Sequence, residues 1–307
     1  MRVALWRVGF GLGLGLGLVA CGNSSSSPAG AAAGGQAAGG TGGAAGGATA
    51  ASGTDSGGAV AAACPAAPPQ HQPSGTMVEL TFAPTLAGKP LLVLEPIQLT
   101  DGTLTPSNAR FYVSELALLK DDGTSLAVDL LGADGKPEAY GIHFVNLEEP
   151  ASLSIRTLAP AGNYNGATFT WGLNDACNAS TGLGSPLSFD SQMMWPHVAG
   201  FLFLRYEAQW VASSTTSTAL GPPTMIHMGG MVGSISAPKA HVAGTLTVPA
   251  SGNVTRNVQM SFDQIFFGAS STEDVSDLPP FFQTPEIVAG ERLRRGVPTL
   301  PVFTLLP

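Results

Sequence analysis

Short alternations of apolar and polar residues recur along the chain from about residue 76 onward. Val78, Leu80 and Phe82 alternate with Glu79 and Thr81. Successive side chains of a β-strand point to opposite faces, so this two-residue period predicts strands with one buried face. The same period predicts strands over residues 152–156, 168–173, 242–248 and 254–262, and the apolar run 201–204 predicts a central strand buried on both faces.

Turn-forming pairs such as Asp101-Gly102, Asp122-Gly123 and Ser251-Gly252 separate these segments. Many short strands joined by regular turns are typical of β-sandwiches. We therefore expect an all-β fold, an antiparallel β-sandwich of Ig-like or jelly-roll-like type, in one domain over residues 76–307. Helices are expected only as short pieces over residues 186–193 and 284–294.

The N-terminus has the features of an export signal. Arg2 and Arg7 precede an apolar run over residues 8–20. This run is too short to span a bilayer as a helix, and Cys21 follows it directly. This resembles a bacterial lipoprotein signal, so residues 1–20 are expected to be removed and Cys21 lipidated. Because Gly22 follows instead of aspartate, we expect an outer-membrane lipid anchor, with the domain periplasmic or surface-exposed. An ordinary secretory signal is the alternative.

Residues 21–75 consist, after the expected lipidated cysteine, almost entirely of Gly, Ala, Ser, Thr and Pro. Such a composition has too few large apolar side chains to form a core and predicts a disordered linker. A flexible linker of about 45 residues has a root-mean-square reach of roughly 37 Å, enough to hold a domain clear of a membrane.

The charge and the motifs exclude several functions. The net charge is −8, and basic residues cluster only at Arg292-Leu293-Arg294-Arg295, so we expect no nucleic-acid partner. The sequence has no HExxH, GxSxG or P-loop motif and no GxGxxG after a strand, so we expect no enzymatic activity. Cys64 and Cys177 remain after lipidation, and in an exported chain they are expected to form a disulfide; the alternative is that both are free thiols.

Residues 194–229 bring imidazole, thioether and indole groups together in the sequence. Imidazole and thioether donors suit copper, whereas hard cations prefer the carboxylates and carbonyls that are scarce here. Copper is therefore the first hypothesis for this stretch.

Six segments also occur in the order seen in MbnP-like copper-binding proteins, and the chain resembles this family over most of residues 77–268. They are Val78–Phe82, Phe111–Leu118, Leu158–Tyr164, Phe169–Asn174, Met194-Trp195 leading into Gly200–Phe203, and His227–Gly230. The resemblance implies an exported β-sandwich that binds copper. In some members a tryptophan is oxidised to kynurenine by a partner di-haem protein of the MbnH type, and the modified side chain helps to hold the metal.

Residue by residue, the resemblance places Trp195 on the first tryptophan of the family's Met-x-Trp-x-Trp stretch and His227 on the histidine of its His-x-Gly motif. His197 stands where many members have the second tryptophan, and either adds a ligand or marks a rebuilt site. Among the methionines at most one is expected to be a ligand, and Met228 beside His227 is the candidate. The expected metal residues are thus Trp195, His197, His227 and Met228.

Two function classes remain open at this point. The first is a copper-binding lipoprotein that captures, stores or handles copper at the cell envelope. The second is a surface β-sandwich for adhesion, envelope structure or carbohydrate contact, whose histidines are merely structural. His143 and His241 lie on ordinary predicted strands and are expected to be structural or surface groups in either case.

Overall fold

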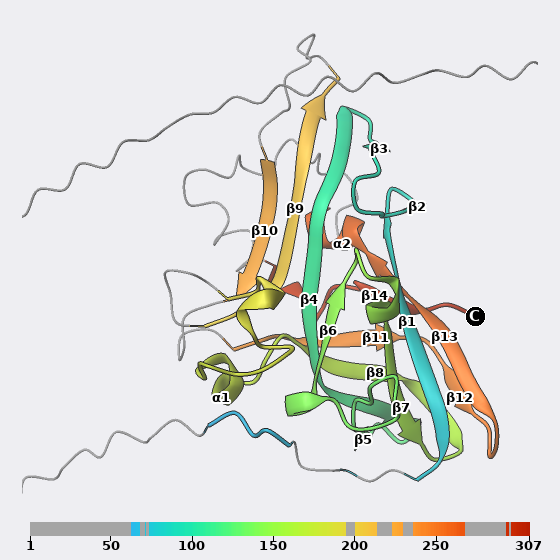
Figure 1. The fold of residues 1–307 in the computed structure, drawn as a ribbon. Coiled ribbons are helices and arrows are strands. Elements are labelled where there is room, and N and C mark those ends of the chain that lie inside the picture. The colour runs from blue at the N-terminus through green and yellow to red at the C-terminus, as the bar shows by residue number, and fades with distance from the viewer. Residues whose placement is uncertain are drawn as a thin grey trace, which may run out of the picture. The chain divides into compact units, whose positions relative to one another are not determined.

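The computed structural model describes residues 63–67, 71, 74–194, 200–213, 223–229, 236–267, 293–294 and 296–307. Fourteen strands among these residues form one mixed sheet (Figure 1). Its strands are β1 (Thr76–Leu86), β2 (Lys89–Pro90), β3 (Ile97–Gln98), β4 (Gly102–Lys120), β5 (Ser125–Ala127), β6 (Ile142–Asn146), β7 (Ser154–Ala159), β8 (Gly162–Trp171), β9 (Leu202–Ala212), β10 (Pro223–Gly229), β11 (Lys239–Ala243), β12 (Leu246–Val248), β13 (Asn253–Ser261) and β14 (Phe303–Leu305).

The helices in the described part of the chain are short. They are α1 (Asp175–Asn178), α2 (Phe262–Phe267) and the 3-10 turns η1 (Ala139–Gly141), η2 (Pro150–Leu153) and η3 (Phe189–Ser191). The helix expected over residues 186–193 is therefore reduced to the three-residue η3, and most of the other expected helix lies outside the described residues. No helix in the described ranges is long and apolar enough to cross a membrane.

The longest strand, β4, divides the sheet into two layers. One edge of β4 pairs with β9 through residues 102–111 and then with β8 through residues 113–120, while its other edge pairs with β3, β6 and β5. The partner changes between Phe111, opposite Leu204 of β9, and Val113, opposite Trp171 of β8; just beyond it the β4–β8 pairing has a register shift between Ser114 and Ala117, where Glu115 has a left-handed backbone (φ 50°). A bulge of this kind bends a strand, so β9 and β10 diverge from β8 and β11.

Aromatic side chains fill the space between the layers. Phe82 of β1 contacts Phe111 of β4 at 5.3 Å, Phe169 of β8 at 6.1 Å and Phe303 of β14 at 5.9 Å between ring centroids. Because β1 is hydrogen-bonded to neither β4 nor β8, the contacts of Phe82 with Phe111 and Phe169 form across the interior of the folded-over sheet. The predicted all-β, sandwich-like fold is thereby confirmed.

The sheet is mixed, which corrects the expectation of a purely antiparallel sandwich. β1 runs parallel to β13 from Met77 opposite Asn253 to Thr85 opposite Ser261, and β11 runs parallel to β14. Alternation along a strand reports which residues are buried but carries no information on the direction of the neighbouring strand.

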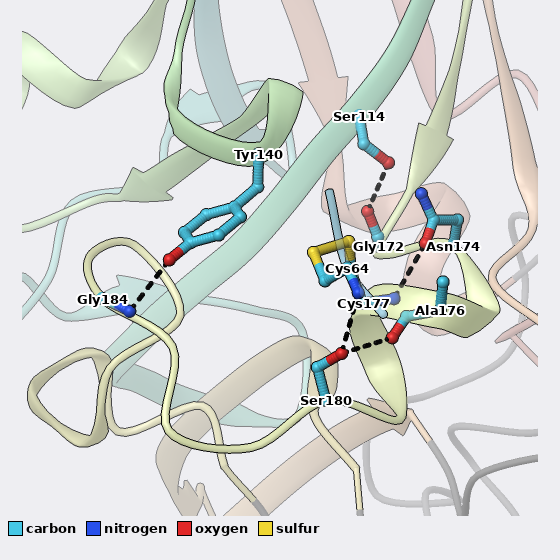
Figure 2. Close-up of a disulfide and its surroundings, with 9 residues drawn as sticks. All are labelled: Cys64, Ser114, Tyr140, Gly172, Asn174, Ala176, Cys177, Ser180 and Gly184. Atoms are coloured by element: carbon cyan, nitrogen blue, oxygen red, sulfur yellow. Dashed lines mark hydrogen bonds between the residues drawn. A yellow bond between two sulfur atoms is a disulfide. The ribbon is translucent and has the colours of Figure 1, made fainter. Parts of the chain in front are cut away.

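A disulfide attaches the segment before β1 to the folded domain. The chain divides into the units Met1–Gly57, outside the described residues, and Gly58–Pro307. Cys64 forms a disulfide with Cys177 of α1, and its backbone N–H donates to Ser180 Oγ at 3.0 Å (Figure 2). Cys64 thus belongs to the β-sandwich, although composition assigned residues 21–75 to the linker.

Candidate metal site

His227 lies on β10, a strand that has one face toward the core and the other face outward. Thr224, Ile226 and Met228 are buried, and the alternate residues Met225, His227 and Gly229 are half-buried. Neighbouring residues on a strand point to opposite faces, so His227 and Met228 point away from each other. Met228 is fully buried in the hydrophobic core. The predicted ligands Met228 and His227 therefore lie on opposite faces of β10.

Two charged residues of β9 surround the His227 ring. His227 pairs directly with Arg205 in the sheet, and Glu207 lies two residues further along the same face. His227 Nε2 is 3.1 Å from Glu207 Oε1, which also accepts from Arg205 Nε at 2.9 Å. A second Arg205 nitrogen donates to Glu207 Oε2 at 3.2 Å. The carboxylate is thus held in a fixed orientation by two cationic or potentially cationic partners.

This geometry determines the ionisation of Glu207. Partial burial raises the pKa of the Glu207 carboxyl, but the hydrogen bonds from His227 and Arg205 outweigh it and lower the pKa to about 2. An ionised carboxylate is only an acceptor, so His227 Nε2 must carry the proton of this hydrogen bond. When the imidazole is neutral, its lone pair is then on Nδ1.

A third strand and a loop complete this outer face. Arg110 of β4 is paired with Arg205, so that Arg110, Arg205 and His227 form a row across β4, β9 and β10. Gln192, in a left-handed conformation (φ 57°), accepts from Arg205 through its backbone oxygen at 2.9 Å and from Arg110 through Oε1 at 3.0 Å. Both arginines therefore fix residue 192 over the sheet, three residues before Trp195.

Trp195 and His197 lie within residues 195–199, outside the described residues. The described residues on either side of them are paired with each other. Met194 forms a β-bridge with Phe201, and Leu202 N donates to Met193 O at 2.7 Å. Leu202 is in turn paired with Gly229 of β10, two residues from His227. Both ends of the segment predicted to carry ligands are therefore attached beside the strand of His227.

Within the described ranges, no group of three or more His, Cys, Asp or Glu side chains could hold a metal ion. Met193 is fully buried in the core, and Met194 packs against the core. The other ligand candidates from the sequence, Trp195 and His197, lie outside the described residues.

The remaining candidates have separate positions. Cys21 lies outside the described residues. His143 is held at both ring nitrogens, with Nδ1 2.8 Å from Glu138 Oε1 and Nε2 2.8 Å from Ser152 O, so its role is structural. His241 is exposed on β11.

A pocket of about 190 Å³ lies near the disulfide, lined by Glu115, Asp129, Tyr140 and His71 among others. Its carboxylates are already engaged: Glu115 accepts from Thr170 and Lys239, each at 2.6 Å, and Asp129 accepts from the backbone N–H of His71. The pocket shares none of its lining residues with the face of His227.

Comparison with known proteins supports the resemblance seen in the sequence. The MbnP family model matches residues 75–283. The chain belongs to the MbnP family. The match contains His227, Glu207, Arg205 and the segment 195–199, but begins after Cys64. The MbnP-family assignment and the extent expected from sequence, residues 77–268, are thereby confirmed.

Among solved structures, MbnP from Methylosinus trichosporium is similar, with 17% sequence identity and a TM-score of 0.48. The alignment covers 76% of this chain and 98% of that chain. No curated protein matches the chain.

Sequence reasoning did not identify Glu207, Arg205 or Gln192 as parts of the site. Arg205 and Glu207 directly follow the predicted strand 201–204 and are two residues apart, so a longer strand would place them on one face. Their partnership with His227 depends on the register between β9 and β10, which sequence alone does not give for strands joined by a long connection.

Proposed function

We propose that this protein is a non-enzymatic lipoprotein of the cell envelope that binds copper in order to capture, store or handle it. The observation that carries the proposal is the hydrogen bond from His227 to the ionised Glu207 on the outer face of β10. Membership of the MbnP family supports the same position, because the match includes the strand of His227.

The Glu207 carboxylate suits His227 for a metal. A metal-bound histidine commonly donates its other ring N–H to a carboxylate, which fixes the tautomer and makes the ring a better ligand. His227 would contribute an imidazole nitrogen to copper, with Glu207 as the carboxylate partner of the ring. Bound copper would supply a soft Lewis-acid centre that accepts nitrogen and sulfur donors.

His227 would share copper with side chains from the segment 195–199. His197 would provide a second imidazole. Trp195, once oxidised to kynurenine by an MbnH-type di-haem partner, would provide an aryl amine and a ketone in place of an indole, which offers only an N–H donor. The attachment of Met194 to Phe201, and of Leu202 to Gly229, supports this assignment because it brings the ends of the segment beside β10.

Lipidation at Cys21 would anchor the protein to the outer membrane, with residues 22–62 as the tether and the sandwich periplasmic or surface-exposed. The tether would separate the metal site from the lipid surface. Attachment is tested by metabolic labelling with a fatty acid, which a Cys21→Ala variant should not incorporate.

One observation favours the alternative, a surface sandwich that holds no metal. Arg205, Glu207 and His227 form an ion-pair network that is satisfied without a metal. In that case the network would serve only to join β9 to β10.

Copper content distinguishes the two functions. Elemental analysis of the purified protein, after copper loading and desalting, should give a defined stoichiometry, and competition with a chelator should give the affinity. We expect His227→Ala to weaken copper binding strongly, His197→Ala somewhat less, and the exposed control His241→Ala hardly at all. Equal affinity in wild type and a folded His227→Ala variant would exclude the site.

A further inference from the structure

The pocket near the disulfide is formed by several separate parts of the chain. It is lined by residues 114–116 of β4, residues 128–130 after β5, residues 140–141 of η1, the residue before α1 and the segment that follows Cys64. Figure 2 draws three of its lining residues, Ser114, Tyr140 and Asn174, around the disulfide. Because its lining includes no residue of β9 or β10, whatever this pocket binds is independent of the face of His227.

Covalent and hydrogen bonds hold the walls of the pocket together. Leu116 O accepts from Val128 N at 3.0 Å, and both of these residues are buried. The disulfide attaches the segment after Cys64 to α1. The backbone N–H of His71 donates to the two carboxylate oxygens of Asp129 at 3.2 and 3.1 Å. The cavity is therefore preformed, as binding sites for small molecules usually are.

Two lining residues have a backbone conformation that non-glycine residues seldom adopt. Glu115 has a φ of 50° and Tyr140 a φ of 61°, both in the left-handed region. Such residues persist only where the surrounding structure imposes the conformation, and they are concentrated at ligand-binding sites. Here the two positions supply the pocket with a carboxylate and an aromatic ring. The Tyr140 hydroxyl accepts from Gly184 N at 3.0 Å, which fixes the ring (Figure 2).

The charge of the lining is negative. Burial raises the pKa of the Glu115 carboxyl, but the hydrogen bonds from Lys239 and Thr170 outweigh it and lower the pKa, so this group is ionised at neutral pH. Both bonds end on Oε2 at 2.6 Å, and a carboxylate can accept at about four positions, so acceptor capacity remains. Asp129 is the second acidic side chain, and no Lys or Arg among the described residues lines the pocket. This lining favours a cation.

The chemistry of the lining suits an organic cation better than a metal ion, since no trio of His, Cys, Asp or Glu side chains in the described part of the chain could hold a metal. An ammonium group donates up to three hydrogen bonds, which are strong when a carboxylate accepts them. The face of an aromatic ring such as Tyr140 also attracts a cation. Leu116, Val128 and Leu130 supply apolar lining for the rest of such a molecule.

The size of the cavity limits the ligand. Its volume is about 190 Å³, somewhat larger than an apolar cavity of about 150 Å³ that binds benzene. A single ring or a short chain that carries one ammonium group therefore fits.

We propose that the pocket lined by Glu115, Asp129 and Tyr140 is a second binding site, for primary amines with a short apolar body. The carboxylates accept hydrogen bonds from the ammonium group, and the ring of Tyr140 and the leucine and valine residues of the lining contact the apolar body. The site is independent of the proposed copper function, and each stands or fails by its own measurement.

Three molecules that share a benzene ring and differ in charge test the inference. Benzylamine is cationic at neutral pH, benzyl alcohol is neutral and benzoate is anionic. Each is titrated into the purified full chain with its disulfide intact, and glucose is titrated as a neutral sugar. Amide shifts are followed by NMR, with Leu116, Leu130 and Gly141 reporting on the pocket and Ile226 and Gly229 reporting on β10.

We expect benzylamine to cause saturable shifts at the pocket amides and not at β10. It should bind about tenfold or more tightly than benzyl alcohol, because hydrogen bonds between charged groups are stronger than those between neutral groups. Benzoate and glucose should not bind.

Two variants remove one negative charge each and keep an acceptor oxygen in place. Asp129→Asn and Glu115→Gln should each weaken benzylamine binding about tenfold, by the loss of the charged acceptor. The matched control is Asp121→Asn, which removes the same charge from an exposed turn outside the pocket and should bind as wild type does.

Benzyl alcohol or glucose that binds as tightly as benzylamine overturns the assignment of a cation. Shifts that do not saturate, or that appear at β10 instead, overturn the site. Wild-type affinity in both folded carboxylate variants also overturns it, whereas a loss in one variant alone supports the site and identifies the carboxylate that holds the ammonium group. If neither variant folds, the ligand series on wild type decides.

Discussion

Glu207 accepts a hydrogen bond from His227 across two neighbouring strands, with Oε1 3.1 Å from Nε2. The two residues are twenty positions apart, and the register of β9 with β10 brings them together. Since Glu207 also accepts from Arg205 at both oxygens, the imidazole is held against a carboxylate that cannot easily turn away. The first prediction concerns the charge of this carboxylate.

Replacing Glu207 with Gln should change the pH dependence of stability. The carboxyl pKa is lowered from 4.5 to about 2 because the hydrogen bonds from His227 and Arg205 outweigh burial. A lowered pKa means that the ionised group stabilises the fold above pH 4.5 and loses this effect as the pH falls toward 2. The free energy of unfolding of Glu207→Gln should be lower than that of wild type at pH 6, and the difference should shrink at acid pH.

The matched control is Glu148→Gln, since Glu148 forms an exposed ion pair with Arg110 and should contribute little. Denaturant titrations of the three proteins at several pH values provide the measurement. A constant difference between wild type and Glu207→Gln down to pH 2 would contradict the account of Glu207.

Two truncated proteins should differ in stability according to whether they retain Cys64. A chain that begins at residue 58 keeps the disulfide, which spans 113 residues, and a chain that begins at residue 74 does not. A disulfide typically stabilises a fold by about 2–4 kcal/mol, and the stabilisation is larger for longer loops. Both chains should fold, with the longer one more resistant to urea, and a reducing agent should remove most of the difference. Equal resistance under oxidising conditions would show that Cys64 contributes nothing.

Introducing a methyl group at Gly229 should disturb the joint between β9 and β10. A Cβ there would lie 2.5 Å from Phe201 O and 2.8 Å from Leu202 Cα, and these backbone atoms have little freedom to move. We expect Gly229→Ala to lower the free energy of unfolding by about 1–3 kcal/mol, typical of overpacking, and to weaken copper binding. Gly162→Ala is the control, because its Cβ would have only an ordinary contact at 3.9 Å with Tyr164.

Replacing the imidazole of His143 should lower the stability of the fold without changing copper binding. Its two nitrogens connect Glu138 to the backbone of Ser152, and the side chain is 12% exposed. We expect His143→Phe to cost about 1–3 kcal/mol, the usual effect of leaving buried polar partners unsatisfied. Thermal unfolding and copper titration of the same sample separate the two effects. A loss of copper binding in a folded His143→Phe variant would show that the site extends to β6.

Native protein should carry kynurenine at Trp195, whereas protein produced without the di-haem partner should keep the indole. Peptide mass spectrometry detects the conversion as the loss of one carbon and the gain of one oxygen in the peptide that contains Trp195. Native protein that binds copper with an unmodified Trp195 would reject the modification while leaving the imidazole site in place.

Much of the fold could be predicted because strand periodicity is a local property. The alternation predicted around Val78, Leu80 and Phe82 recurs in the structure along all eleven residues of β1. The parallel pairing of β1 with β13 could not be predicted, since these strands are more than 160 residues apart and either direction would bury the same side chains. The pairing of Cys64 with Cys177 could be predicted because the expected lipidation of Cys21 leaves Cys64 a single possible partner.

For the site, the residue types and the family could be predicted from the sequence: an imidazole at position 227, a tryptophan at 195, and the ordered motifs of the MbnP family. The alternation along β10 already implied that Met228 points away from His227, because neighbouring strand residues face opposite sides. Only the tertiary structure decided that Glu207 and Arg205 hold His227 and that Asn178 Oδ1 accepts from the Phe201 amide. Such partnerships depend on sheet register and on the packing of distant segments, which arise when the whole chain buries its core.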